Sequence, residues 1–477
     1  MESLLSQYHE DRSRQGEPGE GSFTGAAGGA ACGDLARISV EPISGRIERV
    51  TFDAEGCAAT RAACSCIAEM VEGGSILEAA AIGTDDLDRA LGGLSPVSSH
   101  AAVLATDALH RALSALASSG SPIADPNPDR VLVAVSGGVD SAVAALRERE
   151  RGAEVVAVTV KLWADPDTDG TKACCSPEAV LGARAVTHSM GIPHFTLDLE
   201  DQFRSRVVSR FLDGYAEGQT PNPCVLCNGE VRISAMVELA DRLGATHLVT
   251  GHYAQIVNDG EGDLLAEGSD SNKDQSYMLA ALPTAVISRL RFPLARISKP
   301  EVREIASRNS LSVAKKPESQ DLCFLAGSSK KAFLQRHADL GDLDGPVLDS
   351  SGREIGRHSG HHHFTVGQRR GIGVAAARPL YVTATDAATN SVTAGPREEL
   401  AAERVSVGRA VMHRDGARVD RVRLRYRSAA VPATVVAPAG CHDLLEIELG
   451  QPFEGVAPGQ AAVLMSGETV VGHGTIK

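Results

Sequence analysis

One short string constrains the fold of this chain more than any other: Ser136-Gly137-Gly138-Val139-Asp140-Ser141. It follows an apolar run at residues 131–135 and opens a helical pattern at residues 141–151, the order of a buried strand, a tight turn and a helix. Paired glycines let the backbone approach an anion, and N–H groups at a helix N-terminus stabilise negative charge. The string is not a Walker-type loop, so we predict a phosphate site of another kind.

The side chains of the loop add to this prediction. Ser136 and Ser141 offer hydroxyl donors, and Asp140 offers a carboxylate to Mg²⁺. Strand and helix patterns alternate after the loop, which is typical of a doubly wound α/β sheet. We expect strands at residues 154–160, 194–198 and 247–250, and helices at residues 177–190 and 231–243.

The 477 residues are too many for a single core. Residues 1–30 are rich in Gly, Ser and Glu and are expected to be partly loose, whereas residues 38–52 predict two strands around a Ser44-Gly45 turn. Short alternating runs after residue 404 predict a small β-barrel or sandwich. The predicted parts are residues 1–118, a Pro- and Ser-rich linker at 119–130, an α/β domain at 131–330, a central domain at 331–402 and a β domain at 403–477.

The formal net charge of −14 argues against a nucleic-acid partner, but the charge is uneven. Residues 1–118 carry 17 acidic and 8 basic side chains, a local net of −9, while residues 403–428 carry eight arginines. On charge alone this arginine strip is a solvated strand face, although arginines can also bind phosphate. No apolar run is long enough to span a membrane, and no signal peptide is evident, so we expect a cytoplasmic protein without a membrane partner.

Cysteines form the second informative pattern. Ten are present, and in the cytoplasm they are expected to be reduced. Cys224 and Cys227 form a C-x-x-C pair just before a helical pattern, where a helix N-terminus is expected to lower the thiol pKa. Such thiolates suit sulfur transfer or cluster ligation, although a structural zinc half-site has the same spacing. Cys323, in the segment 318–324, is the third cysteine of interest.

From about residue 130 to residue 477 the chain resembles the tRNA-specific 2-thiouridylase family. The resembling segments are residues 136–141, 220–228, 251–254, 273–277, 318–324, 365–371, 425–427 and 458–460. The resemblance implies a pyrophosphatase-loop ATP domain, which adenylates the C2 oxygen of a wobble uridine so that sulfur can replace it. It also implies tRNAs for Lys, Glu and Gln as substrates, and a cysteine desulfurase or another sulfur donor as partner.

The resemblance assigns roles position by position. Cys227 matches the nucleophile and Cys323 the persulfide carrier. The ATP-contacting positions are Ala134, Val135, Ser136, Gly137, Gly138, Val139, Asp140, Ser141, Val160 and Gly251. The target-base positions are Asn222, Pro223 and Cys224. The tRNA positions are His252, Lys273, Asp274, Gln275, Arg425, Tyr426 and Gln460. In this context the arginine strip is expected to contact phosphate, and the His361-His362-His363 run is expected to lie in a solvated or tRNA-side loop.

Two mechanisms of sulfur delivery stay open. In the first, Cys323 carries a persulfide and Cys227 closes a disulfide with it. In the second, Cys224, Cys227 and Cys323 hold a [4Fe–4S] cluster whose fourth iron carries sulfur. Three thiolates with one open iron site favour the cluster.

Residues 1–118 resemble the U-type iron–sulfur scaffold family. The resembling residues are Cys32, Asp34, Cys57 and His100, which in that family surround a cluster or zinc. Ala101 stands where the family has a third cysteine, which puts ordinary scaffold function in doubt. Cys64, two helical turns after Cys57, is a substitute candidate. A fused donor would raise the effective concentration of cluster or sulfur at the acceptor site.

Two other functions compete with the thiouridylase. A synthetase with the same ATP loop would not need the cysteines at 224, 227 and 323 or the arginine-bearing β domain. A non-enzymatic iron–sulfur carrier with a vestigial ATP domain would not need the intact loop at residues 136–141. The sequence therefore predicts a tRNA-uridine 2-sulfurtransferase that uses ATP and Mg²⁺. Two further cofactors are expected: a [4Fe–4S] cluster, and zinc or an iron–sulfur centre in the N-terminal domain.

Overall fold

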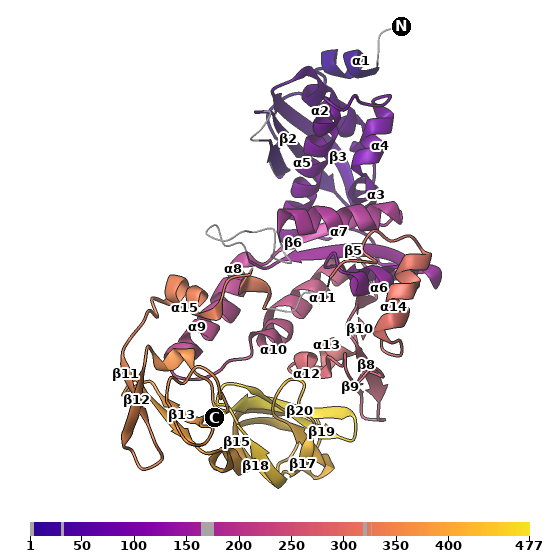
Figure 1. Ribbon diagram of the computed structural model, residues 1–477. Helices are drawn as coiled ribbons and strands as arrows, with labels where there is room; N and C mark the ends of the chain where they lie inside the picture. The colour runs from indigo at the N-terminus through magenta and orange to yellow at the C-terminus, as the bar shows by residue number, and fades with distance from the viewer. Residues whose placement is uncertain (1–3, 30–32, 164–175, 318–321, 326) are drawn as a thin grey trace.

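The computed structural model describes residues 4–29, 33–163, 176–317, 322–325 and 327–477. The chain runs from an N-terminal domain at the top of Figure 1, through an α/β domain, to a β-rich part at the bottom. Within the described residues, no helix is both long enough and apolar enough to cross a bilayer.

The N-terminal domain packs helices on a three-stranded antiparallel sheet. Its elements are α1 (Leu4–Glu10), β1 (Phe23–Gly28), β2 (Leu35–Ile43), β3 (Arg46–Glu55), α2 (Ala58–Val71), α3 (Ile76–Ala81), α4 (Thr84–Ala90) and α5 (Ser99–Ser118). The predicted Ser44-Gly45 turn is confirmed, with φ values of 48° and 77°; positive φ at both positions is typical of a tight hairpin turn. The expectation of looseness is wrong for β1, which pairs along its length with β2.

The α/β domain is built on a five-stranded parallel sheet of order β10-β7-β4-β5-β6, which confirms the doubly wound prediction. The strands are β4 (Arg130–Ala134), β5 (Glu154–Lys161), β6 (His194–Asp198), β7 (His247–Thr250) and β10 (Leu290–Arg291). The main helices are α6 (Val139–Glu150), α7 (Pro177–Ser189), α11 (Ile233–Arg242) and α14 (Lys299–Arg308). Because successive side chains of a strand point to opposite faces, β4 buries apolar residues on both.

The two faces of this sheet lie in two different cores. Val131 and Val133 pack with α6, α7 and α14. Leu132 and Val156 belong to a core that contains residues of α11 and also the interior of the N-terminal domain. Helix α5 contacts β6, so the N-terminal domain covers part of the sheet and continues its core (Figure 1).

Polar contacts fix this docking. Arg184 of α7 bonds Asp107 of α5 at 3.1 Å, with 8% and 16% of their side chains exposed. Ser114 donates to the carbonyl of Thr196 in β6 at 2.8 Å. The predicted linker is anchored as well, because the N–H of fully buried Ile123 donates to the Arg242 carbonyl at 2.8 Å. The N-terminal domain is therefore packed against the α/β domain over its last helix and the segment that follows.

The last third of the chain is β-rich. Helix α15 (Lys330–Ala338) precedes a four-stranded sheet of order β12-β11-β14-β13, formed by β11 (Gly345–Leu348), β12 (Glu354–His358), β13 (Tyr381–Asp386) and β14 (Ser391–Gly395). Six further strands form a barrel, which β15 closes by pairing with both β18 and β20. They are β15 (Ala401–Met412), β16 (Arg421–Arg423), β17 (Val431–Thr434), β18 (Gly440–Glu454), β19 (Ala461–Ser466) and β20 (Thr469–Ile476). The predicted C-terminal β-barrel is confirmed.

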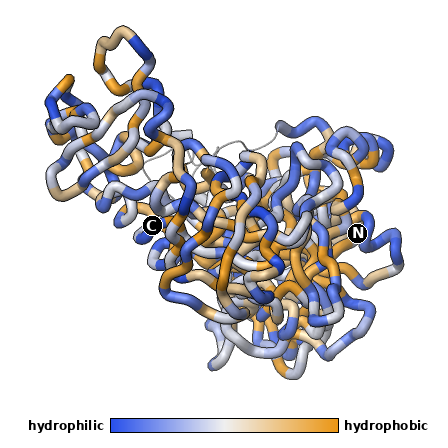
Figure 2. The backbone as a smooth tube through the Cα atoms, turned by 90° about the horizontal axis from the view of Figure 1, so that it is seen from below, coloured by the Kyte–Doolittle hydropathy of each residue, from blue (hydrophilic) through white to orange (hydrophobic). Residues whose placement is uncertain are grey.

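A hairpin from the α/β domain extends the barrel sheet. It consists of β8 (Ala254–Asn258) and β9 (Asp263–Glu267), and β9 pairs with β20. Figure 2 shows apolar stretches of the backbone gathered toward the interior, with hydrophilic turns at the periphery. The hairpin joins the α/β domain and the barrel, and so helps to fix the edge of the sheet where the candidate site lies.

Candidate active site

The loop between β4 and α6 is folded as a phosphate site would require. Gly137 has φ +69°, and Gly138 is the N-cap residue of α6, a helix of 12 residues. The Ser141 hydroxyl accepts from the Ser136 N–H at 3.1 Å and donates to the Gly138 carbonyl at 3.1 Å. The loop is therefore braced from within and lies at the N-terminus of α6, where the helix favours an anion.

Gly251 allows the end of β7 to approach this loop. A Cβ atom at Gly251 would lie 2.8 Å from the carbonyl carbon of Asp140 and 2.8 Å from the nitrogen of Ser141. These are backbone atoms, so they cannot move aside cheaply. A side chain at residue 251 would push the loop away from the strand.

The Asp140 carboxylate lies in a partly buried ion pair. Lys299, the first residue of α14, approaches its two oxygens at 2.7 and 2.6 Å, and the Tyr253 hydroxyl donates to it at 2.8 Å. A second lysine, Lys316, donates to the Gly137 carbonyl at 2.9 Å. The carboxylate that the sequence assigned to magnesium thus has an ammonium partner in the structure.

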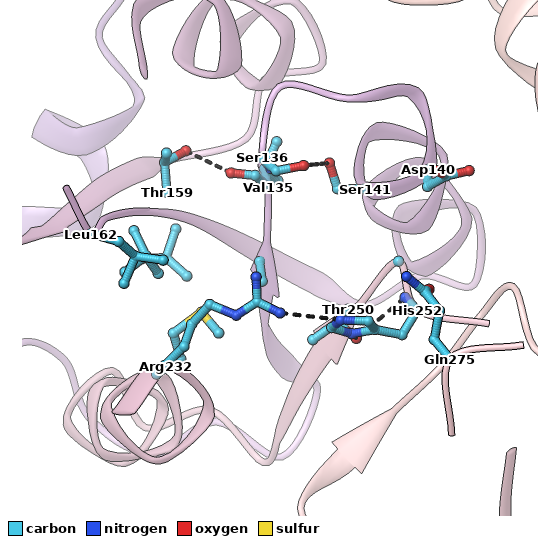
Figure 3. A pocket seen from close by; sticks show the side chains of 15 residues that line it. Val135, Ser136, Asp140, Ser141, Thr159, Leu162, Arg232, Thr250, His252 and Gln275 are labelled. Carbon is cyan, nitrogen blue, oxygen red and sulfur yellow. Dashed lines mark hydrogen bonds between the residues drawn. The ribbon is translucent and has the colours of Figure 1, made fainter. Parts of the chain in front are cut away.

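A cavity of about 210 Å³ opens beside the loop (Figure 3). It is lined by Ala134, Val135, Ser136, Asp140, Ser141, Val160 and Gly251, among others. The other predicted ATP positions, Gly137, Gly138 and Val139, line an adjoining cavity of about 880 Å³. Every predicted ATP position therefore faces one of two neighbouring cavities, which share Ser136 and Asp140 in their walls.

The larger cavity also contains all three cysteines of interest. Cys224, Cys227 and Cys323 line it together with the phosphate loop, and all three are free thiols. Cys224 and Cys227 lie on the short helix α10 (Pro223–Cys227), and Cys323 begins the 3₁₀ turn η4 (Cys323–Leu325). Residues 318–321 of the predicted Cys323 segment lie outside the described residues.

Two features position these cysteines. The Asn222 side chain caps α10 by accepting from the N–H groups of Cys224 and Val225, each at 3.2 Å, and Pro223 suits the first helical position. Next to Cys323, the Phe324 ring is buried and packs against Phe203, Phe211 and Phe333.

The expected lowering of the thiol pKa by the helix N-terminus is wrong for Cys224. Burial raises the pKa of this thiol, and the charge of Arg232 only partly opposes the shift. The cause is that protein atoms surround most of the Cys224 thiol, which disfavours the charged thiolate.

The predicted tRNA positions divide into two groups. His252, Lys273, Gln275 and Tyr426 line the larger cavity, as do Pro223 and Arg427. The side chains of Asp274, Arg425 and Gln460 instead bond within the protein. Asp274 accepts from the N–H of Gly268 and from Ser276 and Arg423. Arg425 donates to the Gly455 carbonyl at 2.6 Å.

Gln460 holds the segment before α10. Its side-chain amide donates to the Thr220 carbonyl at 2.6 Å, and the Thr220 N–H donates to the Pro458 carbonyl at 2.7 Å. The barrel therefore binds the chain at Thr220, two residues before the N-cap residue Asn222. In this structure the Gln460 amide is engaged in that contact, and its role toward tRNA stays a prediction.

The expectation of a phosphate-binding strip fails for several arginines of residues 403–428. Arg414 and Arg418 pair with Asp259 at the tip of the β8–β9 hairpin, at 2.8 and 2.9 Å. Arg423 pairs with Asp274 and with Glu267 of β9. These arginines hold the barrel to the hairpin. The histidine run is likewise not a solvated loop, because His361 and His362 are 5% and 2% exposed.

In the N-terminal domain, Asp34, Cys57 and His100 form a compact donor group, with ligand atoms all within 4.8 Å of one another. His100 Nε2 lies 3.0 Å from Asp34 and 3.7 Å from the Cys57 sulfur. Gly56, at φ +120°, allows this approach, since a Cβ there would lie 2.1 Å from the Asp34 carboxylate. A thiolate, an imidazole and a carboxylate form a donor set that suits Zn²⁺ or an iron ion.

The other predicted ligands of this group do not join it. Cys64 is fully buried in the core, where burial raises its pKa to about 12, so it does not replace a ligand beside exposed Cys57. The reason is that Cys57 caps α2 whereas Cys64 lies on its inward face. Ala101 is also fully buried. Cys32 lies outside the described residues.

Sequence reasoning missed three cavity residues. Arg232, Lys299 and Lys316 line the walls with the phosphate loop, but none belongs to a recognisable motif. The only available signal is local: Lys299 follows Ser298, which with Glu301 caps the start of α14.

Comparison with known proteins finds four families that match successive parts of the chain. The families described as NifU-like N terminal domain, tRNA methyl transferase HUP domain, tRNA methyl transferase PRC-barrel domain and Aminomethyltransferase beta-barrel domain match residues 2–119, 129–327, 331–396 and 399–476. The Bifunctional protein NifU/MnmA of Rubrobacter xylanophilus is 45% identical over 97% of this chain and 95% of its own. The tRNA-specific 2-thiouridylase MnmA of Syntrophotalea carbinolica is 43% identical over 72% of this chain and 98% of its own.

Among solved structures, the U34-tRNA thiolase NcsA from Methanococcus maripaludis with its [4Fe-4S] cluster is 20% identical over 44% of this chain and 68% of its own, with a TM-score of 0.27. A parallel sheet with a phosphate loop, a cysteine-lined cavity and two small β domains places the chain in the class of pyrophosphatase-loop enzymes that modify tRNA. Within that class, the chain belongs to the bifunctional NifU/MnmA family, the tRNA-specific 2-thiouridylases with a fused NifU-like domain.

Proposed function

We propose that the protein is an ATP-dependent tRNA-uridine 2-sulfurtransferase. The C2 oxygen of the wobble uridine attacks the α-phosphorus of ATP, the bond to the β-phosphate breaks, and pyrophosphate leaves. A sulfur nucleophile then attacks C2, the C2–O bond breaks, and AMP leaves with the original oxygen. The product is 2-thiouridine in the tRNA, and the substrates are expected to be tRNAs for Lys, Glu and Gln.

A single observation carries this proposal: the phosphate loop and the three thiols face one cavity of about 880 Å³. The uridine must be joined to the α-phosphate and then attacked by sulfur without leaving the site. Both groups must therefore lie within the length of one nucleotide, and a shared cavity provides that. Reduced thiols are also required, which is consistent with a cytoplasmic protein.

The cavity fits both modes of sulfur delivery. In the relay, a Cys323 persulfide attacks C2, and the Cys227 thiolate then breaks the S–S bond, which leaves sulfur on C2 and a Cys227–Cys323 disulfide for an external dithiol to reduce. In the other mode, Cys224, Cys227 and Cys323 would hold a [4Fe–4S] cluster, which supplies an open iron site for sulfide. All three free thiols line this one cavity, as a shared cluster requires, so we favour the cluster.

The binding of ATP and Mg²⁺ depends on other groups around the cavity. The loop N–H groups at α6 are positioned for phosphate, and Lys299 and Lys316 supply positive charge beside them. We propose that Mg²⁺ enters with ATP and competes with Lys299 for the Asp140 carboxylate. The donor group of Asp34, Cys57 and His100 is proposed to carry the zinc or iron–sulfur centre of the N-terminal domain, which supplies sulfur or cluster together with a desulfurase.

Pyrophosphate release tests this function against an iron–sulfur carrier with a vestigial ATP domain. Purified protein is incubated with ATP and Mg²⁺, with and without unmodified tRNA, and pyrophosphate is measured. We expect release that depends on tRNA and is lost in a Ser136→Ala, Asp140→Asn double variant. Equal release with and without tRNA, or no release at all, would contradict the proposal.

A further inference from the structure

Arg232 lies where the two cavities meet. It ends η3 (Asn228–Arg232), a π-helical turn that directly follows the cysteine helix α10. Such turns are rare and occur frequently at functional sites. The Arg232 side chain lines both the 210 Å³ cavity of the phosphate loop and the 880 Å³ cavity of the cysteines.

The guanidinium is held by one of its nitrogens. Its Nη2 donates to the Asn228 side chain at 2.7 Å and to His252 Nε2 at 3.1 Å. Burial and the nearby Arg232 charge lower the pKa of His252 to about 3, so this imidazole is neutral and accepts. Its other nitrogen then donates to the Thr250 hydroxyl at 2.7 Å. Figure 3 shows Arg232 reaching into the cavity toward His252.

The rest of the guanidinium is unused. The bonds to Asn228 and His252 both use Nη2. Among the described residues, neither Nη1 nor the buried Nε of Arg232 has a hydrogen-bond partner. Arg232 is also the single arginine or lysine among the described residues that line the smaller cavity. A preorganised positive charge therefore faces a cavity in which the one lining carboxylate from the described part of the chain, Asp140, is already paired with Lys299.

The position of Arg232 indicates which atoms of the substrate its charge would contact. In the adenylated uridine, one oxygen joins the α-phosphorus to C2, so that oxygen must lie between the phosphate loop and the cysteines. Arg232 is in the wall shared by both. We propose that Arg232 is a further catalytic residue, which donates to the α-phosphate of ATP and then to the AMP that leaves C2.

This proposal rests on the proposed function and refines it. Negative charge on the α-phosphoryl group grows as uridine attacks and again as AMP departs. The Nη1 group of Arg232 is left to donate to such oxygens, and a donor placed in advance costs no reorganisation at the moment of reaction. Removal of one such donor slows chemistry by about 10²- to 10³-fold in comparable sites.

The test compares Arg232→Gln and Arg232→Lys with Arg206→Gln. Arg206 is an exposed arginine outside both cavities and serves as the matched control. Single-turnover release of pyrophosphate and formation of 2-thiouridine are measured at saturating ATP and tRNA, with melting temperatures for each variant. We expect Arg232→Gln to slow pyrophosphate release about 10²-fold or more, Arg232→Lys to keep part of the rate, and the control to match wild type.

Pyrophosphate release within twofold of wild type in Arg232→Gln would overturn the proposal. If thiouridine formation alone were lost, Arg232 would act on the Cys224 thiol and not on phosphate. If Arg232→Gln failed to fold, Arg232→Lys would decide, since it keeps the charge but loses the Nη1 donor that the two Nη2 bonds hold in place, and it is expected to slow release at least tenfold. A wild-type protein that makes no thiouridine would instead contradict the proposed function.

Discussion

The reactivity of the cavity depends on how individual residues set the charge of its thiols and anions. Burial keeps Cys224 protonated, and Arg232 is the nearby charge that opposes this effect. A cluster, or an attacking persulfide, needs thiolate. The free protein therefore holds Cys224 in a form that must lose a proton before it acts.

Alkylation of Cys224 is expected to reflect this burial. Because its pKa is raised, less thiolate is present at neutral pH than for an ordinary thiol, and the rate should still rise above about pH 8.5, the usual thiol pKa. Iodoacetamide labelling from pH 6 to 10, read by peptide mass spectrometry, measures the rate. Exposed Cys441 of the same chain serves as the internal standard. A rate for Cys224 that levels off below pH 8 would contradict the account.

Gly251→Ala tests the close approach of β7 to the phosphate loop. The added Cβ would lie 2.8 Å from backbone atoms of Asp140 and Ser141, so the loop must shift. We expect a loss of about 1–3 kcal/mol in stability and a rise in KM for ATP. Gly182→Ala is the control, because nothing lies within 4 Å of its added Cβ; it should be neutral or slightly stabilising. Unchanged ATP kinetics in Gly251→Ala would count against the assigned loop geometry.

Single residues also show where sequence reasoning ends. Most of the ten ATP positions and the three cysteines lie in short contiguous motifs, and the family resemblance supplied Ala134, Val135 and Val160. The structure places all thirteen around two adjoining cavities. That agreement leaves their individual roles as predictions. Arg232, Lys299 and Lys316 reach the same walls through tertiary folding from positions without a motif, so no local pattern reveals them.

At the scale of elements, the strands and helices of the parallel sheet were predictable because their periodicity is local. The pairing of the β8–β9 hairpin with the barrel was not predictable, because Ala266 of β9 and its partner Thr469 of β20 are about two hundred residues apart in the sequence. The same long-range contacts pair three arginines of the strip, Arg414, Arg418 and Arg423, with Asp259, Glu267 and Asp274.

The contact between the barrel and the α10 segment gives a prediction at this scale. Gln460→Ala removes the bond to the Thr220 carbonyl and leaves that acceptor without its donor. We expect thiouridine formation to slow about tenfold, or roughly 1.4 kcal/mol, as for an unsatisfied part-buried carbonyl, with little change in the Kd for tRNA. Exposed Gln451→Ala is the control. A large rise in Kd with an unchanged single-turnover rate would instead support a direct tRNA contact by Gln460.

Across the whole molecule, the N-terminal domain is docked and not loosely tethered. Its core continues into one face of the parallel sheet, and in Figure 1 the domain lies at the top whereas α10 lies lower, toward the barrel. His100 lies seven residues before Asp107 on α5, about 10 Å at the helical rise, and Asp107 makes the docking contact with Arg184. The donor group of Asp34, Cys57 and His100 is therefore carried by the helix that docks on the α/β domain.

The buried pair between Asp107 and Arg184 measures how much this docking stabilises the chain. Asp107→Ala leaves an arginine that is only 8% exposed without its partner across the interface, and such losses cost about 3–5 kcal/mol. Chemical denaturation with separate probes in each domain reads the effect. Glu69→Ala, an exposed change on α2, is the control. If Asp107→Ala lowered the free energy of unfolding no more than the control, the two domains would not be coupled.

The most direct test of the account is an anaerobic reaction of the purified, reconstituted protein with ATP, Mg²⁺, sulfide and unmodified tRNA, scored for 2-thiouridine by mass spectrometry. The visible absorbance of a thiolate-bound cluster is recorded for wild type and for Cys224→Ala. We predict that wild type makes thiouridine. We also predict that Cys224→Ala loses both this product and the part of the absorbance that comes from a cluster held by the cavity cysteines. Thiouridine formed without a chromophore would contradict the cluster and favour the relay through Cys227 and Cys323, and no thiouridine under any condition would contradict the function itself.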